Sequence, residues 1–348
     1  MLKPHVVILG AGFGGVYVAK RLKRLVKRGE IELTIVNRTN YFLFTPLLHE
    51  VAAGSLSPAS VAEPVREIFK GCNVKFCQGS IESIDVANRC VNIRGVQSSG
   101  ANVTNGFGGG KHSIQYDYLV IATGAETNYY NIPGAEQFSM PLKTLSDAVK
   151  IRSRVIDSFE GAALCDNPEE KLCRLSFAVV GGGPTGVELA AELKEFVREL
   201  VARYYGAAGC LSQEPQISLI EIGTELLSRF PLPLRQAATA RLRENGVNLH
   251  LGNKVAAVTP KGITLSNNTT IPASTVIWTV GVKPAIPTFE GFVPELVAGR
   301  LAVDEYFRVG GDERVFALGD VAAYVNSSAA AAGENSPPRG ACDETEEL

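Results

Sequence analysis

Two glycine-rich turns constrain what this chain can fold into more than any other feature of its sequence. The first, Gly10-Ala-Gly-Phe-Gly-Gly15, and the second, Gly181-Gly-Gly-Pro-Thr-Gly186, both fit the spacing G-x-G-x-x-G. Each follows a short apolar run, at 5–9 and 177–180, and each precedes a segment with helical periodicity. In this context of strand, turn and helix, the spacing binds the pyrophosphate of a dinucleotide. The sequence therefore predicts an α/β fold with two Rossmann-like, three-layer dinucleotide-binding domains.

The glycines of such a turn have separate physical tasks. They allow a tight turn, close approach of the backbone to the pyrophosphate, and close packing of the helix on the strand. The start of the helix also offers unpaired N–H groups and a partial positive charge to the phosphates. We therefore expect the first nucleotide at Gly10, Gly12, Phe13, Gly14 and Gly15, and the second at Gly181, Gly183, Pro184, Thr185 and Gly186.

The residue that ends the second strand of such a unit normally binds the ribose, and the two units differ there. Glu221 ends the strand predicted at 217–221, which favours NADH because a carboxylate would repel the 2′-phosphate of NADPH. In the first unit this place holds Asn37, followed by Arg38. Asparagine can hydrogen-bond to a ribose as donor and acceptor, but it discriminates less than a carboxylate does. We expect Asn37 and Arg38 to contact the first nucleotide.

Three further turns follow predicted strands in the order that two nucleotide sites would require. One strand closes on Ala122-Thr123-Gly124, and a later strand closes on Val280-Gly281 in the same manner. Further along, Gly319-Asp320 places a carboxylate directly after a strand. Two nucleotides in one chain imply electron transfer between them, and a flavin with a nicotinamide is the ordinary pair.

Composition and charge argue against several classes of protein. The 348 residues, of which 45% are hydrophobic and 20% charged, predict two globular domains. The net charge of -2, with no basic run of the kind that binds phosphate backbones or anionic lipid, gives no indication of nucleic acid. The seven cysteines and four histidines are scattered, so we expect no metal site and idle thiols in a reducing compartment. We find no signal peptide and no apolar stretch of the roughly 18 residues that a transmembrane helix needs, which predicts a cytoplasmic protein.

Taken in order, these pieces resemble the two-dinucleotide-binding flavoprotein oxidoreductases over residues 5–320. The finer resemblance is to type II NADH:quinone oxidoreductases, the non-electrogenic NADH dehydrogenases of respiratory electron transfer. It is carried by Asn40-Tyr-Phe-Leu-Phe-Thr-Pro-Leu-Leu48, Leu56-Ser-Pro58, Thr185-Gly-Val-Glu-Leu-Ala-Ala-Glu192 and Val276-Ile-Trp-Thr-Val-Gly281. The resemblance implies FAD at the first turn and NADH at the second, with Asp320 holding the ribityl or phosphate part of FAD.

The resemblance also implies roles for single residues and a reaction. Thr45, Pro46 and Leu47 are expected beside the flavin, and Glu188 near the nicotinamide and the flavin. The helix pattern itself starts at 187, so Glu188 falls in the first helical turn, where an acid is mildly stabilising, by roughly 0.3–1 kcal/mol. In the implied reaction, hydride passes from C4 of NADH to N5 of the flavin and two electrons then pass to a membrane quinone, while the protein orients the rings.

The implied layout is a discontinuous FAD-binding domain at 1–125 and 285–325, with an NADH-binding domain inserted at 126–284. Residues 326–348 contain few large apolar residues and end acidic, which predicts a disordered tail. The family normally continues with a glutamine-rich helix, a further subdomain and amphipathic membrane-binding helices, and the tail matches none of them. We therefore expect a C-terminally truncated chain, attached at most peripherally to the cytoplasmic face of the inner membrane, with a homodimer left open.

Four alternative functions compete with this interpretation. A disulfide reductase would need a C-x-x-x-x-C pair after the ribose strand, and residues 40–71 hold no cysteine. A sulfide:quinone reductase would need cysteines at the flavin, but Cys72 and Cys77 fall in a predicted strand region. A ferredoxin- or rubredoxin-reductase-like enzyme differs mainly in its electron acceptor and stays open. A truncated nucleotide-binding protein with weak turnover also stays open, because the expected downstream wall of the flavin site has no match.

Overall fold

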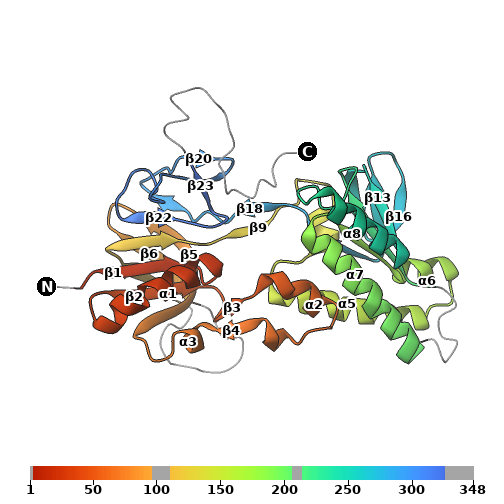
Figure 1. The fold of residues 1–348 in the computed structure, drawn as a ribbon, viewed down its shortest axis with the longest axis horizontal. Coiled ribbons are helices and arrows are strands. Elements are labelled where there is room, and N and C mark those ends of the chain that lie inside the picture. The colour runs from red at the N-terminus through yellow and green to blue at the C-terminus, as the bar shows by residue number, and fades with distance from the viewer. Residues whose placement is uncertain (1–2, 96–109, 206–213, 326–348) are drawn as a thin grey trace. The chain divides into compact units, whose positions relative to one another are not determined.

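The computed structural model describes residues 3–95, 110–205 and 214–325 of the chain. The tail expected at 326–348 lies outside these described residues. The chain divides into two compact units, each of which combines helices and strands (Figure 1). Unit 1 comprises Met1–Leu43, Glu63–Glu126 and Val282–Leu348, and unit 2 comprises Phe44–Ala62 and Thr127–Gly281.

Unit 1 is built on a sheet whose centre is parallel. The strand β1 (His5–Leu9) lies between β2 (Glu32–Asn37) and β8 (Tyr118–Ile121), parallel to both. The order along the sheet is β22-β8-β1-β2-β5-β6-β7, with β6 and β7 antiparallel to their neighbours. The other strands of this sheet are β5 (Val74–Asp85), β6 (Cys90–Gly95), β7 (Lys111–Gln115), β22 (Val315–Ala317) and β19 (Phe289–Glu290), which pairs with β5.

The apolar run of β1 is continuous because both faces of the sheet are covered. Ile8 packs in one buried cluster with Val16 of α1 (Phe13–Arg28), which Figure 1 shows in red beside β1 and β2. Leu9 points to the opposite face and packs in a second cluster with Leu301 of β21 (Arg300–Val303). Residues near the end of the described chain therefore complete the buried cluster to which Leu9 of β1 contributes.

Tyr116 is a weak point of this second cluster. Its side chain is 4% exposed, and its hydroxyl has no hydrogen-bond partner among the described residues. A buried unsatisfied hydroxyl costs about 1–3 kcal/mol, so Tyr116→Phe is expected to raise the free energy of unfolding by about 1 kcal/mol near neutral pH. Denaturant unfolding of both proteins measures this difference. A variant less stable than the wild type would contradict the expectation.

The same tyrosine gives the stability a pH dependence. Burial raises the pKa of Tyr116 to about 12, whereas the unfolded chain has the ordinary value of 10.0. As the pH rises through the unfolded value, ionisation stabilises the unfolded chain first, so the wild type loses stability. The advantage of the phenylalanine variant should therefore grow between about pH 10 and pH 12. Repeating the unfolding measurement across this range tests the sign.

Unit 2 contains a fully parallel sheet in the order β10-β17-β11-β12-β13. On one face, Trp278 and Val180 pack in a buried cluster with residues of a small antiparallel sheet, β14-β15-β16. On the other, Phe177 stacks on Phe159 of α5 (Leu145–Ala163) at 6.4 Å between ring centroids. The strands are β10 (Ser139–Pro141), β11 (Ser176–Val180), β12 (Gln216–Glu221), β13 (Val247–Leu251), β14 (Val255–Thr259), β15 (Gly262–Leu265), β16 (Thr270–Pro272) and β17 (Thr275–Trp278).

The helices of unit 2 correct the sequence analysis in two places. The helix α5 (Leu145–Ala163) has no counterpart among the predicted helices, although Thr144 and Asp147 form a complete capping box at its start. The helix α7 (Pro184–Leu200) begins at Pro184 rather than at 187, because proline is well suited to the first helical position. Glu188 is therefore the fifth residue of α7, and the statement that it lies in the first turn was wrong.

Residues 44–62 belong to unit 2, although the expected FAD-binding domain at 1–125 included them. The reason is that α2 (Leu48–Ala52) packs on both α5 and α7. No helix of the described ranges is both long and apolar enough to cross a membrane. The remaining elements are β3 (Tyr41–Leu43), η1 (Thr45–Leu47), η2 (Pro58–Ser60), β4 (Ala62–Pro64), α3 (Val65–Ile68), β9 (Ala125–Thr127), α4 (Ala135–Phe138), α6 (Pro168–Arg174), η3 (Val201–Tyr205), α8 (Leu232–Glu244), β18 (Val282–Pro284), β20 (Leu296–Val297) and β23 (Ala322–Tyr324).

Candidate functional site

The two glycine turns have the same backbone construction, one in each unit. The first glycine of each turn donates its N–H to the neighbouring strand, Gly10 to the carbonyl of Val36 and Gly181 to that of Ile220, both at 2.8 Å. Both glycines adopt a positive φ, 108° at Gly10 and 116° at Gly181. Residues with a Cβ rarely adopt this conformation, so the first position of each turn requires glycine.

The last glycine of each turn is required by contact, whereas the middle glycine faces open space. A Cβ on Gly15 would lie 1.9 Å from the carbonyl oxygen of Gly10, and a Cβ on Gly186 would lie 1.9 Å from that of Gly181. A Cβ on either middle glycine, Gly12 or Gly183, would meet no heavy atom within 4 Å.

These middle glycines are the N-caps of α1 and α7, and no side chain caps either helix. Each helix start therefore presents its N–H groups to a space that a Cβ would fill, and a pyrophosphate fits that arrangement.

The residue that ends each second strand is tied to its own glycine turn. Asn37 Oδ1 accepts a hydrogen bond from the N–H of Ala11 at 3.0 Å. At the matching place in unit 2, Glu221 Oε2 accepts from the N–H of Gly182, and Oε1 accepts from Gly223 at 2.8 Å. The amide nitrogen of Asn37 donates to the carbonyl and hydroxyl oxygens of Thr39, at 2.9 and 3.0 Å. Asn37 thus retains a single oxygen lone pair to accept a hydrogen bond from a ribose, whereas a carboxylate would have more acceptor sites left.

The other expected residues of the first turn also lie in unit 1. Phe13 is 49% exposed and packs edge-to-face on Phe42, with 5.1 Å between ring centroids. Gly14 packs so closely on Leu318 that a Cβ would lie 2.6 Å from its Cδ1 atom. Arg38 is exposed and forms an ion pair with Glu126 at 3.8 Å.

The turn after β8 is fixed by the chain that returns into unit 1. The hydroxyl of Thr123 donates to the carbonyl of Ala285 at 2.6 Å, and the N–H of Ala285 donates to the carbonyl of Gly124 at 2.9 Å. Ala122 is buried, and its backbone lies against the first glycine turn. Its carbonyl oxygen would lie only 2.2 Å from a Cβ on Gly10. The Thr123 hydroxyl is therefore an anchor for this turn.

In unit 2 the matching turn lies against the second glycine motif. A Cβ on Gly181 would come within 3.2 Å of Val280, and a Cβ on Gly281 would lie 2.3 Å from the hydroxyl of Tyr130. Pro184 and Thr185, at the first two positions of α7, are exposed. The expected contacts of the second nucleotide therefore all belong to one compact unit.

The Gly319-Asp320 turn depends on a residue that the sequence analysis did not single out. Gly319 has a positive φ of 78°, and the main-chain oxygen of Asp320 accepts a hydrogen bond from Arg300 Nε at 3.2 Å. Arg300 is 6% exposed, so this contact is buried while Asp320 itself is exposed. No local sequence signal connects two residues that are 20 positions apart.

Thr45, Pro46 and Leu47 form the short turn η1, in unit 2. Thr45 and Pro46 are exposed, and Leu47 is half-buried. The first glycine turn belongs to unit 1, so the structure groups these residues with the second turn instead. Their place beside a flavin stays a prediction.

Glu188 is joined to the helix that follows η1. Its Oε2 atom lies 3.4 Å from Nδ1 of His49, whose side chain is 12% exposed. One helical turn along α7, Glu192 accepts a hydrogen bond from the hydroxyl of Ser55 at 2.8 Å. The two glutamates, four residues apart, therefore hold the 49–55 segment against α7, which is a role that the sequence did not indicate.

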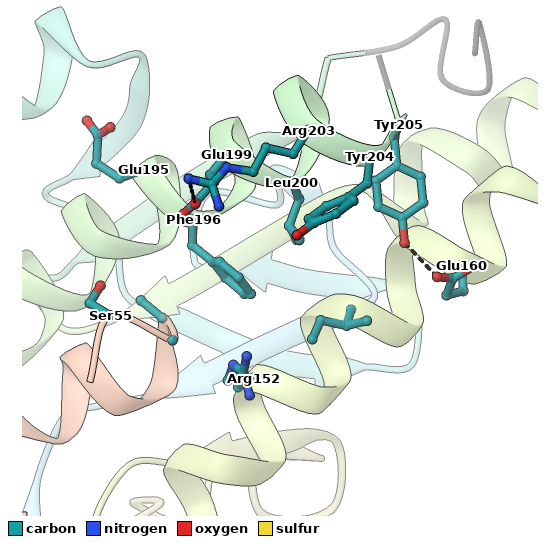
Figure 2. Close-up of a pocket in the computed structure, with 13 residues that line it drawn as sticks. Ser55, Arg152, Glu160, Glu195, Phe196, Glu199, Leu200, Arg203, Tyr204 and Tyr205 are labelled. Carbon is teal, nitrogen blue, oxygen red and sulfur yellow. Dashed lines mark hydrogen bonds and ion pairs between the residues drawn. The ribbon is translucent and has the colours of Figure 1, made fainter. Parts of the chain in front are cut away.

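A cavity of about 600 Å³ lies beside α2, α5 and α7 in unit 2 (Figure 2). The hydroxyl of Tyr205 donates to Glu160 at 2.7 Å there, and burial, reinforced by this contact, raises the pKa of Tyr205 to about 12. Arg203, on the same element as Tyr205, forms an ion pair with Glu199 at 2.8 Å. None of the nucleotide-turn residues lines this cavity.

The two cysteines that follow the ribose strand, Cys72 and Cys77, have no disulfide in the part of the chain that the structure describes. Cys77 is buried in β5, and burial raises the pKa of its thiol. Cys72 lies just before that strand. Within the ranges that the structure covers, no group of three or more His, Cys, Asp or Glu residues could hold a metal ion.

The chain is similar to known flavoprotein oxidoreductases. The family described as pyridine nucleotide-disulphide oxidoreductase matches residues 4–336. The mitochondrial external alternative NAD(P)H-ubiquinone oxidoreductase B2 of Arabidopsis thaliana is 38% identical over 330 residues, which cover 92% of this chain and 54% of that protein. The type II NADH:quinone oxidoreductase Ndh of Mycobacterium tuberculosis is 32% identical over 328 residues, which cover 92% of this chain and 67% of that protein.

A solved structure shares the fold. The NDH2 of Plasmodium falciparum, in complex with NADH, superimposes with a TM-score of 0.80 at 28% identity, covering 93% of this chain and 65% of that one. The chain spans about half the length of the first plant relative, at 54%.

Proposed function

The chain belongs to the pyridine nucleotide-disulphide oxidoreductase family, and within it to the type II NADH:quinone oxidoreductases; we propose that it oxidises NADH and passes the electrons through FAD to a quinone. The observation that carries this proposal is the duplication of the glycine turn, with the same hydrogen bonds and the same open helix start in both units. The family relationship supports FAD in unit 1 and NADH in unit 2.

Each turn supplies binding and orientation rather than acid–base chemistry. In unit 1, the N–H groups at the start of α1 would hold the pyrophosphate of FAD, Asn37 would contact its ribose, and Asp320 would lie at its ribityl or phosphate part. In unit 2, the start of α7 would hold the pyrophosphate of NADH and Glu221 its ribose. When bound, the two cofactors supply hydride transfer and onward two-electron transfer.

Glu188 is proposed to act near the nicotinamide and the flavin, with Thr45, Pro46 and Leu47. Its contact with His49 supports a positioning role, because the imidazole fixes the carboxylate on one side of α7. The structure contains no catalytic triad among the residues named for either site, and the proposed reaction needs none.

The proposal is tested by the flavin absorbance of the purified chain. We expect yellow protein, or colourless protein that becomes yellow on reconstitution with FAD, and we expect NADH to bleach the flavin band under anaerobic conditions. NADPH should bleach it at least about tenfold more slowly, because Glu221 would repel the 2′-phosphate. Protein that cannot be loaded with FAD would overturn the assignment, and equal rates with both nucleotides would refute the role of Glu221.

A second measurement separates the acceptors. NADH oxidation is followed with a soluble quinone analogue and, separately, with ferredoxin. Turnover with the quinone and none with ferredoxin is expected. A ferredoxin- or rubredoxin-reductase-like enzyme would give the reverse, whereas flavin reduction without turnover would show that this chain binds both nucleotides but does not deliver electrons.

A further inference from the structure

The outer face of α1 carries a row of cations. Exposed basic side chains occur at Lys20, Arg21, Arg24, Lys27 and Arg28, and the 16 residues of the helix include no acid. At 3.6 residues per turn, these five positions fall within about a third of the helix circumference. These side chains do not form a continuous basic run along the chain, and only the helix brings them onto one face.

The fold of unit 1 uses the opposite face of this helix. The buried residues Val16, Ala19 and Val26 pack in the cluster beneath it. Arg28 pairs with Glu30 at 3.5 Å, and the Arg21 guanidinium lies 4.9 Å from the ring centroid of Tyr17. Lys20, Arg24 and Lys27 form no ion pair with any residue that the structure describes.

The arrangement works against the stability of the helix. Arg24 has a like charge at each of its neighbouring surface positions, with Lys20 and Arg21 before it and Lys27 and Arg28 after it. Like charges three or four residues apart destabilise a helix. The helix dipole favours cations in the last turn only, which accounts for Lys27 and Arg28 but not for the other three. Folding alone therefore gives no reason for this row.

We propose that the outer face of α1 is a docking surface for an anionic lipid bilayer. The row is about 12 Å long and purely basic, so it matches a continuous layer of phosphate headgroups in charge. Tyr17, 56% exposed at one end of the same face, is of the residue type that favours the headgroup level of a membrane. The inference rests on α1 itself and holds whether or not the protein reduces quinone.

Co-sedimentation with lipid vesicles tests the proposal. The full chain should bind vesicles that contain about one third phosphatidylglycerol in phosphatidylcholine, and not vesicles of phosphatidylcholine alone. Binding should weaken as salt is raised, since the attraction is screened over a Debye length of about 10 Å at 0.1 M salt. Arg24→Glu changes the row by two charges and should weaken binding about 25-fold, at about fivefold for each charge near the surface.

A charge-matched control variant and the thermal unfolding midpoint distinguish a lost lipid contact from a change in net charge or in stability. Arg241→Glu, on exposed α8, changes the net charge equally and should leave vesicle binding unchanged. Arg24→Glu should unfold at the same or a higher temperature than the wild type, because it replaces repulsion by attraction on α1. If Arg24→Glu does not fold, Arg24→Gln takes its place, with about a fivefold expected loss.

Three outcomes would overturn the proposal. The first is wild-type binding that does not depend on phosphatidylglycerol, and the second is an equal loss of binding in Arg241→Glu. The third is binding to a DNA duplex or to polyglutamate without binding to vesicles. Flavin loading, measured in parallel, reports on the proposed function separately, so the two ideas can fail independently.

Discussion

Replacing Gly15 by alanine is expected to remove both the bound flavin and much of the stability of unit 1. The new Cβ would lie 1.9 Å from the carbonyl oxygen of Gly10. Because that oxygen belongs to the backbone, the clash cannot be relieved by a change of side-chain rotamer. Overpacking of this kind costs about 1–3 kcal/mol or more. The variant should therefore unfold at a clearly lower temperature and purify without flavin absorbance.

Gly12→Ala is the matched control, because its Cβ would meet no heavy atom within 4 Å and its backbone is extended. This variant should unfold at the wild-type temperature. It should still bind FAD about 10–100-fold more weakly, since the methyl group would keep the pyrophosphate from the N–H groups, each worth about 1.5–3 kcal/mol to a charged partner. Equal thermal stability of Gly15→Ala and the wild type, or full flavin loading of Gly12→Ala, would refute this account of the turn.

Glu221→Gln is expected to have the second largest effect, on the nucleotide of unit 2. Glutamine offers one acceptor oxygen where the carboxylate now serves the N–H groups of both Gly182 and Gly223. One of these donors would then face an NH2 group, and the repulsion of a 2′-phosphate would disappear. The dissociation constant for NADH should rise about tenfold, and the preference for NADH over NADPH should shrink by a similar factor.

Calorimetric titration with each nucleotide measures both numbers without requiring turnover. Glu244→Gln on α8, whose carboxylate pairs only loosely with Arg241 at 3.9 Å, removes one charge from the same unit and serves as the control. The control should bind both nucleotides as the wild type does. An unchanged preference in Glu221→Gln would show that another residue discriminates the ribose.

The sequence predicted the parts of the fold that local chemistry determines. The glycine turns, the strands beside them and the acid at Glu221 each follow a short local pattern, and the structure has β1, β11 and β12 where the sequence predicts them, with β11 and β12 one residue longer at the start. The start of α7 was misplaced because Pro184 was read as part of the turn rather than as the first helical residue. The helix α5 was missed although Thr144 and Asp147 mark its beginning.

The contacts that sequence could not supply are those between distant segments. Arg300 holds the Gly319-Asp320 turn, and Thr123 is anchored by Ala285, yet neither pair is visible without the fold. The same reason accounts for residues 44–62, which follow unit 1 in sequence but pack on helices formed about 100 positions later. The nucleotide that each turn binds is a separate matter, because it depends on the family relationship.

The position of β22 constrains the order in which the two units can fold during synthesis. That strand, Val315–Ala317, is among the last described residues, yet it pairs with β8 in the sheet that β1 begins. All strands of the unit 2 sheet have been synthesised once Trp278 is made, so unit 2 can fold while β8 still has a free edge. Unpaired strand edges invite association with other chains. The nascent protein therefore passes through a stage in which the main sheet of unit 1 lacks its edge strand β22.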